Sequence, residues 1–191
     1  MKRSKRSLKK LDELRNDPDI ELYALDEVLF QMHGSICKMW IPKDEKNPRI
    51  FLHPTRKTIG FFGAVRLRDG RLFSYRPDGR FDGQSFLTFL KSLRMRTARC
   101  KKKIVLLVDN AKYHHSKIIT DWIKPLDDKF TLLFLPPYSP ELNPIERVWK
   151  LTRRTTIHNR YFKTLDDLTY AVEDLFWSWS APNIILTRLC A

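Results

Sequence analysis

The fold of this chain is decided by two neighbouring stretches, IVLLVDNAKYHH at residues 104–115 and LLFLPPYSPELNPIERVWK at residues 132–150. The first begins with a short, β-branched and continuously apolar run, which is typical of a strand covered on both faces of a sheet. A second such run occupies 131–135, and the prolines after it force an extended loop. Asn143 and Pro144 then predict a helix start, with Asn143 as the N-cap and Pro144 at the first helical position.

The segments outside these two stretches complete the pattern. Four of them have the composition or alternation of strands and predict an antiparallel meander; they cover residues 21–27, 35–41, 57–67 and 71–76. Three have apolar residues at helical spacing; they begin at Asp82, lie around 115–124 and begin near Thr164. Strands followed by alternating helices and strands predict an α/β fold, with a mixed sheet and helices on both faces.

Composition limits the class of protein. The 191 residues suffice for one domain, and a formal net charge of +14 favours a polyanionic partner, nucleic acid before an anionic membrane surface. No apolar run approaches the ~20 residues of a membrane-spanning helix, and the basic N-terminus has no apolar segment behind it, so we expect neither a membrane protein nor a secretory signal. Three widely spaced cysteines favour free thiols in a reducing cytoplasm. We expect a basic tail (1–19), one domain (20–178) and an apolar tail (179–191).

Three carboxylates occupy positions that predict a metal site. Asp26 and Asp109 each come at the expected C-terminal end of a strand, the edge where sites assemble in open α/β sheets, and Glu146 opens a helix. Carboxylates are the hard ligands that Mg²⁺ prefers, and two such ions roughly 3.5–4 Å apart suit phosphodiester chemistry. Each acid also has an ordinary interpretation: a turn cap at Asp26, turn chemistry at Asp109-Asn110, and a favourable first-turn acid at Glu146.

The combination resembles a known family. LDE at 25–27, VDNAKYH at 108–114 and PYSPELNPIERVW at 137–149 are similar to the three acidic motifs of DDE-type transposases, and more narrowly to bacterial insertion-sequence relatives of the mariner group. The resemblance covers roughly residues 20–175 and implies a ribonuclease H-like fold. It also implies that Asp26, Asp109 and Glu146 bind Mg²⁺ or Mn²⁺, two ions per site.

The implied activity is cut-and-paste movement of an element with inverted-repeat ends. Water activated at the metal cuts double-stranded DNA at those ends, and the freed 3′-hydroxyl attacks target DNA at the same site. Two alternatives stay open: a ribonuclease H-like nuclease that cuts without joining, and an inactive or truncated DNA-binding remnant. Both the cutting and the joining enzyme use the same acids, so the residues do not separate them.

Several residues near the acids are candidates for supporting roles. Asn110 and His114 follow the second acid, and Asn143 precedes the third; we expect all three beside the site, with Asn143 chiefly a helix cap. Four residues are candidate contacts to the DNA backbone; they are Tyr138, Lys150, Arg153 and Arg154. A plain loop for the tyrosine and a solvated cationic face for the others are the alternatives.

The chain departs from full-length members of that family in one respect. They carry helix-turn-helix modules before the catalytic domain, whereas about 20 residues precede the first acidic strand here. We therefore expect the second reading frame of a split element, a truncated remnant or a catalytic fragment. A homodimer and an upstream product with a helix-turn-helix domain are the protein partners left open. The expected location is the cytoplasm, at the nucleoid when bound to DNA.

Overall fold

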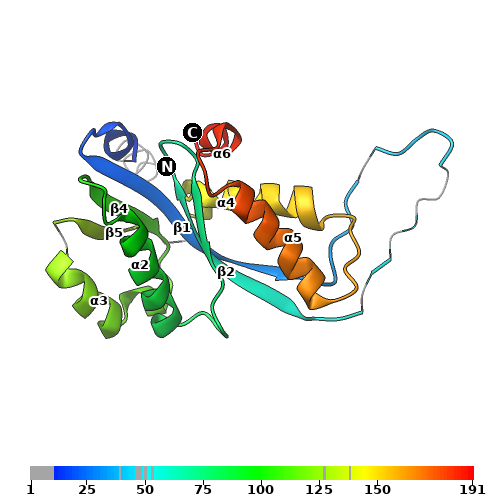
Figure 1. Cartoon of the computed structure of the whole chain (residues 1–191), viewed down its shortest axis with the longest axis horizontal. Helices are drawn as coiled ribbons and strands as arrows, with labels where there is room; N and C mark the ends of the chain where they lie inside the picture. Colours follow the sequence, from blue (N-terminus) through cyan, green and yellow to red (C-terminus); the bar gives the residue numbers. More distant parts are fainter. Residues whose placement is uncertain are drawn as a thin grey trace.

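A computed structural model describes residues 11–38, 40–45, 49, 51–52, 54–126, 128–137 and 139–191. Its centre is a five-stranded mixed sheet in the order β3-β2-β1-β4-β5 (Figure 1). The strands are β1 (Ile20–Gln31), β2 (Thr58–Arg66), β3 (Leu72–Tyr75), β4 (Lys103–Val108) and β5 (Phe130–Phe134). β1, β2 and β3 form an antiparallel meander, whereas β4 and β5 run parallel to β1, because helices connect them.

The helices begin where the sequence supplies caps. The α-helices are α2 (Gly83–Thr97), α3 (Lys117–Ile123), α4 (Ile145–Thr152), α5 (Leu165–Ser178) and α6 (Ile184–Leu189). Short 3₁₀ turns cover Lys112–His115 (η1), Lys124–Leu126 (η2) and Pro140–Leu142 (η3), and Arg153–Ile157 (η4) continues α4 as a π-helix. Both α2 and α5 start with a capping box, in which the side chains of Asp82 and Thr164 accept from the backbone N–H three residues later.

The sheet separates two apolar cores. On one face, α2 and α3 pack over residues such as Leu25 and Leu106; on the other, α4, α5 and α6 pack over residues such as Ala24 and Leu107 (Figure 1). Neighbouring residues of β1 thus point into different cores, as strand alternation requires. The expected α/β, ribonuclease H-like arrangement of a meander followed by alternating strands and helices, covered on both faces, is confirmed.

Two sequence predictions are wrong in detail. The segment 35–41 is not a strand in its described part, where Ser35 makes only an isolated bridge and the exposed side chains of Ile36 and Trp40 have no sheet face to cover. Asn143 does not cap α4 through its side chain; Pro144 holds the cap position.

Both ends of the chain contain helical segments where they are described. The C-terminal segment 179–191 packs back on the domain, because it forms α6 and buries Trp179, Leu186 and Cys190 in the α4–α5 core. Residues 1–10 of the expected basic tail lie outside the described residues, and 11–16 are helical. Among the described helices, none has the length and apolar character needed to cross a bilayer.

Candidate active site

The first two acids lie side by side where the parallel part of the sheet ends. β1 and β4 are paired as far as Ala24 and Leu107, so the same register would bring Asp26 level with Asp109, one residue after the last residue of β4. The prediction that Asp26 ends its strand is wrong, because β1 continues to Gln31 and pairs Asp26 with Gly63 of β2. The site therefore lies at the C-terminal end of β4, whereas β1 continues beyond this point.

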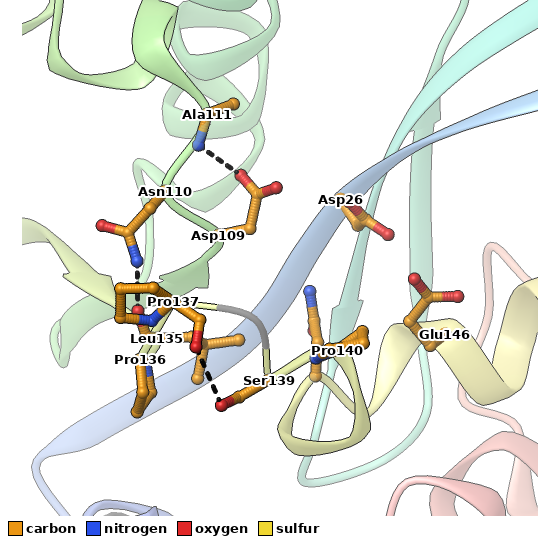
Figure 2. Close-up of a pocket in the computed structure, with 11 residues that line it drawn as sticks. Asp26, Asp109, Asn110, Ala111, Leu135, Pro136, Pro137, Ser139, Pro140 and Glu146 are labelled. Atoms are coloured by element: carbon orange, nitrogen blue, oxygen red, sulfur yellow. Dashed lines mark hydrogen bonds between the residues drawn. The ribbon is translucent and has the colours of Figure 1, made fainter.

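The third acid is brought to the same edge by helix α4. Glu146 lies in the first turn of α4, after the proline-rich loop that follows β5. Together the acids line a cavity of about 470 Å³, and Figure 2 shows Asp26 between Asp109 and Glu146. The cavity is lined by Asp26, Asp109, Asn110, Ala111, Leu135, Pro136, Pro137, Ser139, Pro140, Asn143 and Glu146. The geometry brings together all three acids that the sequence indicated.

Asp26 is the electrostatic centre of the cavity. Burial first, and then the negative charges of Glu27, Glu146 and Asp109, raise the pKa of this carboxyl from 3.8 to about 8. The indole Nε1 of the buried Trp149 donates to its Oδ2 at 3.2 Å. Without a cation, this carboxyl is therefore neutral at pH 7. No lysine or arginine in the described part of the chain pairs with these three acids, and convergent carboxylates have the donor chemistry that a divalent metal ion needs.

A second cluster lies on the other face of β1. The ring of His114, with its side chain only 1% exposed, lies between Glu27 Oε1 (3.0 Å from Nε2) and Asp109 Oδ1 (3.0 Å from Nδ1). The hydroxyl of Tyr113 donates to the same Glu27 oxygen, and burial, then the charge of Glu27, raises the pKa of that phenol. The carboxylates and the imidazole each offer a ligand atom within 4.8 Å of the others. This cluster is therefore a second arrangement able to hold a metal, and it shares Asp109 with the first.

The two asparagines beside the acids act on the backbone. Asn110 donates its side-chain amide to the carbonyl of Leu135 and so ties the end of β4 to the loop after β5. Asn143 donates to the carbonyl of Leu25 at 3.0 Å, and its buried Oδ1 has no hydrogen-bond partner among the described residues. Asn143 therefore fastens the start of α4 to β1, in place of the capping role that the sequence indicated.

The three basic residues predicted to contact DNA are divided between α4, which carries Lys150, and η4, which carries Arg153 and Arg154. Lys150 and Arg154 are exposed, as a phosphate contact requires. Arg153 instead lies over the ring of Phe30, 5.5 Å from its centroid, and donates to the carbonyl of Leu29. Tyr138, the other candidate DNA contact, lies outside the described residues.

Sequence reasoning passed over three residues of the site. Glu27 stood within the LDE motif without a role, although alternation along a strand places it on the face opposite Asp26. Tyr113 stood within the second motif, and only the contact with Glu27 across 86 positions of sequence identifies it. Trp149 stood at the end of the third motif without a role at the site, although its i, i+3 spacing from Glu146 was a signal that it lies near the acids.

The chain matches the family described as DDE superfamily endonuclease over residues 21–169. An insertion element IS630 uncharacterized 39 kDa protein from Shigella sonnei is 38% identical over 134 residues, which are 70% of this chain and 38% of that protein. The uncharacterized protein y4pE/y4sA from Sinorhizobium fredii is 47% identical over 64 residues, which are 34% of this chain and 44% of the relative. The chain thus spans less than half the length of both curated relatives.

Solved structures share the fold at low sequence identity. A Mos1 transposase paired-end complex with left transposon end superposes with a TM-score of 0.70 at 13% identity, over 96% of this chain and 55% of the other. The catalytic domain of Mos1 mariner transposase superposes with a TM-score of 0.64 at 13% identity, over 96% and 82% of the two chains. At this identity the likeness supports the fold alone.

Proposed function

The chain belongs to the DDE superfamily endonucleases, and from that premise we propose that it is the catalytic domain of a transposase. It would cut double-stranded DNA at the ends of an insertion element and join the freed 3′-hydroxyl to target DNA. The observation that carries the proposal is the convergence of Asp26, Asp109 and Glu146 on one cavity from three separate chain segments.

We further propose that these acids bind Mg²⁺ or Mn²⁺, two ions per site. The donor set fits, because three carboxylate side chains supply the oxygen ligands that both cations accept, and a cation would offset the neighbouring negative charges that help to raise the pKa of Asp26. The alternative cluster around His114 fits less well, because both ring nitrogens are within hydrogen-bond distance of carboxylates already. When bound, such ions lower the pKa of water and stabilise the charge of the leaving oxygen.

The chain's own residues would position the substrate and the ligands. The backbone N–H of Ala111 donates to Asp109 Oδ1 at 2.9 Å, which fixes one ligand oxygen. Lys150 and Arg154, one turn and two turns beyond Glu146, would hold phosphates of the DNA backbone as they leave the cavity. No side chain needs to form a covalent bond to DNA in this scheme.

The partners follow from the same argument. The Mos1 structures include a paired-end complex with a transposon end and complexes with Mg and with Mn, which supports DNA and a divalent cation as partners here. A homodimer, and an upstream product with a helix-turn-helix domain that reads the element's ends, are part of the proposal. So is action in the cytoplasm, at the nucleoid.

The test is cleavage and joining of supercoiled plasmid DNA with Mn²⁺ or Mg²⁺. We expect metal-dependent nicking and DNA–DNA joined products with the wild-type chain. Both should fall at least 10²-fold with Asp109→Asn or Glu146→Gln, while unfolding stays cooperative. Asp121→Asn, an exposed carboxylate on α3, is the matched control and should leave both products unchanged. Cleavage that survives Asp109→Asn would refute the site; nicking without joined products would favour the nuclease.

A further inference from the structure

Trp149 makes an unusual contact for a core residue. Its side chain is 1% exposed and packs in the α4–α5 core against Phe176, with ring centroids 5.9 Å apart. Its Nε1–H, however, donates to Oδ2 of Asp26 at 3.2 Å. A buried indole N–H needs an acceptor, and here the acceptor belongs to a carboxylate that lines the cavity.

The neighbouring strand is shaped to receive this indole. Gly63 of β2 pairs with Asp26, and a Cβ built on it would lie 2.2 Å from Cη2 and 2.8 Å from Cζ2 of Trp149. Such distances are well inside van der Waals contact, so no other residue fits unless the indole moves. Gly63 is not one of the described glycines with a positive φ. The lack of space for a side chain, and not the backbone conformation, therefore requires glycine here.

The same helix carries a ligand and the group that orients another ligand. Glu146 and Trp149 are three residues apart on α4, so they lie on one side of the helix. The helix can deliver Glu146 to the cavity only at the depth that Trp149 and Gly63 allow. The contact of Trp149 with Gly63 therefore joins the Asn143–Leu25 hydrogen bond in fixing how α4 carries Glu146 beside Asp26.

We propose that Trp149 is a positioning residue for the metal site: its indole N–H holds Oδ2 of Asp26, leaves the other oxygen for the cation, and reaches that place only because residue 63 has no side chain. This inference rests on the proposed metal site at Asp26, Asp109 and Glu146. Residues that orient a metal ligand by hydrogen bonding to it typically contribute 10–100-fold to metal affinity.

The test measures Mn²⁺ affinity of the whole chain without DNA, by calorimetry, together with the free energy of unfolding. Trp149→Phe removes the donor and should weaken Mn²⁺ binding about tenfold. Trp179→Phe is the matched control, because Trp179 is 6% exposed, packs on the same Phe176 and donates no side-chain hydrogen bond to an acid among the described residues. It should lower stability but leave Mn²⁺ affinity within twofold of wild type.

Two further variants separate positioning from packing. A tryptophan analogue with sulfur in place of the indole N–H, introduced at position 149, keeps the shape and should show the same tenfold loss, even if Trp149→Phe fails to fold. Gly63→Ala should displace the indole and weaken Mn²⁺ binding as well. In the double variant with Trp149→Phe, the second loss should disappear, because the same hydrogen bond is already gone.

The outcomes distinguish this inference from the proposed function. If Mn²⁺ binds to wild type and is lost in Asp109→Asn, but binds the sulfur analogue with wild-type affinity, the role of Trp149 is refuted and the metal site stands. If wild type does not bind Mn²⁺, or Asp109→Asn binds it equally well, both ideas are refuted.

Discussion

Replacing Asp26 with asparagine should make the metal-free protein more stable at neutral pH. The pKa of this carboxyl is raised from 3.8 to about 8 in the folded chain, by burial first and then by the charges of Glu27, Glu146 and Asp109. Between these two pH values the folded state therefore holds a proton that the unfolded state has lost. Because the folded state binds more protons, the free energy of unfolding falls as pH rises through this window.

The size of the effect follows from the pKa shift. Each pH unit above 3.8 costs about 1.4 kcal/mol, so the roughly three units up to pH 7 amount to about 4 kcal/mol. Asparagine imitates the neutral carboxyl, still offers Trp149 an oxygen acceptor and has no proton to lose. Wild type and Asp26→Asn should have similar stability near pH 4. They should diverge to about 4 kcal/mol at pH 7, with little further change above pH 8.

Urea unfolding in EDTA at half-unit steps from pH 4.5 to 8.5 measures this difference. Asp121→Asn, which removes an exposed carboxylate, should instead remain parallel to wild type. In saturating Mg²⁺ the order should reverse, because the wild-type carboxylate gains a cation that asparagine holds poorly. A difference between wild type and Asp26→Asn that stays constant across the pH range would refute the argument that burial and neighbouring charges hold this acid neutral.

The remaining predictions concern the surface, a cap and a turn. Lys150→Ala with Arg154→Ala should weaken binding to duplex DNA and lower the slope of log K against log salt by about 2, measured by fluorescence anisotropy. Thr164→Ala should lower the free energy of unfolding by about 1 kcal/mol, because the capping box of α5 is lost. Gly70→Ala should cost more than about 2 kcal/mol in the same urea assay: its φ is +70° and a Cβ would lie 2.3 Å from the carbonyl oxygen of Asn183.

Matched variants make these outcomes decisive. Lys101→Ala with Lys102→Ala removes two cations at the opposite end of the sheet and should change the salt slope less; an equal change would mean that only net charge matters. Gly34→Ala has the same φ of +70° but a nearest atom at 3.1 Å, so it should cost less than Gly70→Ala. Equal costs would show that backbone conformation, and not the contact with α6, requires the glycine at the turn.

Local signals in the sequence predicted most of the fold. The apolar runs predicted β4 and β5, and the helical spacing after Asp82 and near Thr164 predicted the starts of α2 and α5, because both signals depend on interactions within a few residues. The segment 35–41 was mistaken for a strand, since composition cannot reveal that no sheet face is available to bury Ile36 and Trp40. Asn143 was mistaken for a cap because its actual partner, the carbonyl of Leu25, is 118 positions away in sequence.

The three acids of the candidate site could be predicted from the sequence, but the side chains that hydrogen-bond to the acids could not. Asp109 and Glu146 stand in long, specific motifs, and the strand pattern reached Asp26. The supports of those acids are tertiary: Glu27 meets His114 across the sheet, and Trp149 meets Asp26 across 123 positions. No local period encodes such contacts.

Asp26 and Glu27 have different hydrogen-bond partners because they lie on opposite faces of β1. Asp26 and Glu27 are adjacent, so alternation sends one carboxylate toward α4 and the other toward η1, and both influence the same edge. On the η1 side, Glu27 has His114 and Tyr113 as hydrogen-bond partners. On the α4 side, Asp26 has only the indole N–H of Trp149 as a side-chain donor among the described hydrogen bonds, and it is the acid whose pKa is strongly raised. The face that is short of donors is therefore the face on which a cation would stabilise the site most, and this asymmetry favours the proposed metal site beside Asp26 over one beside Glu27.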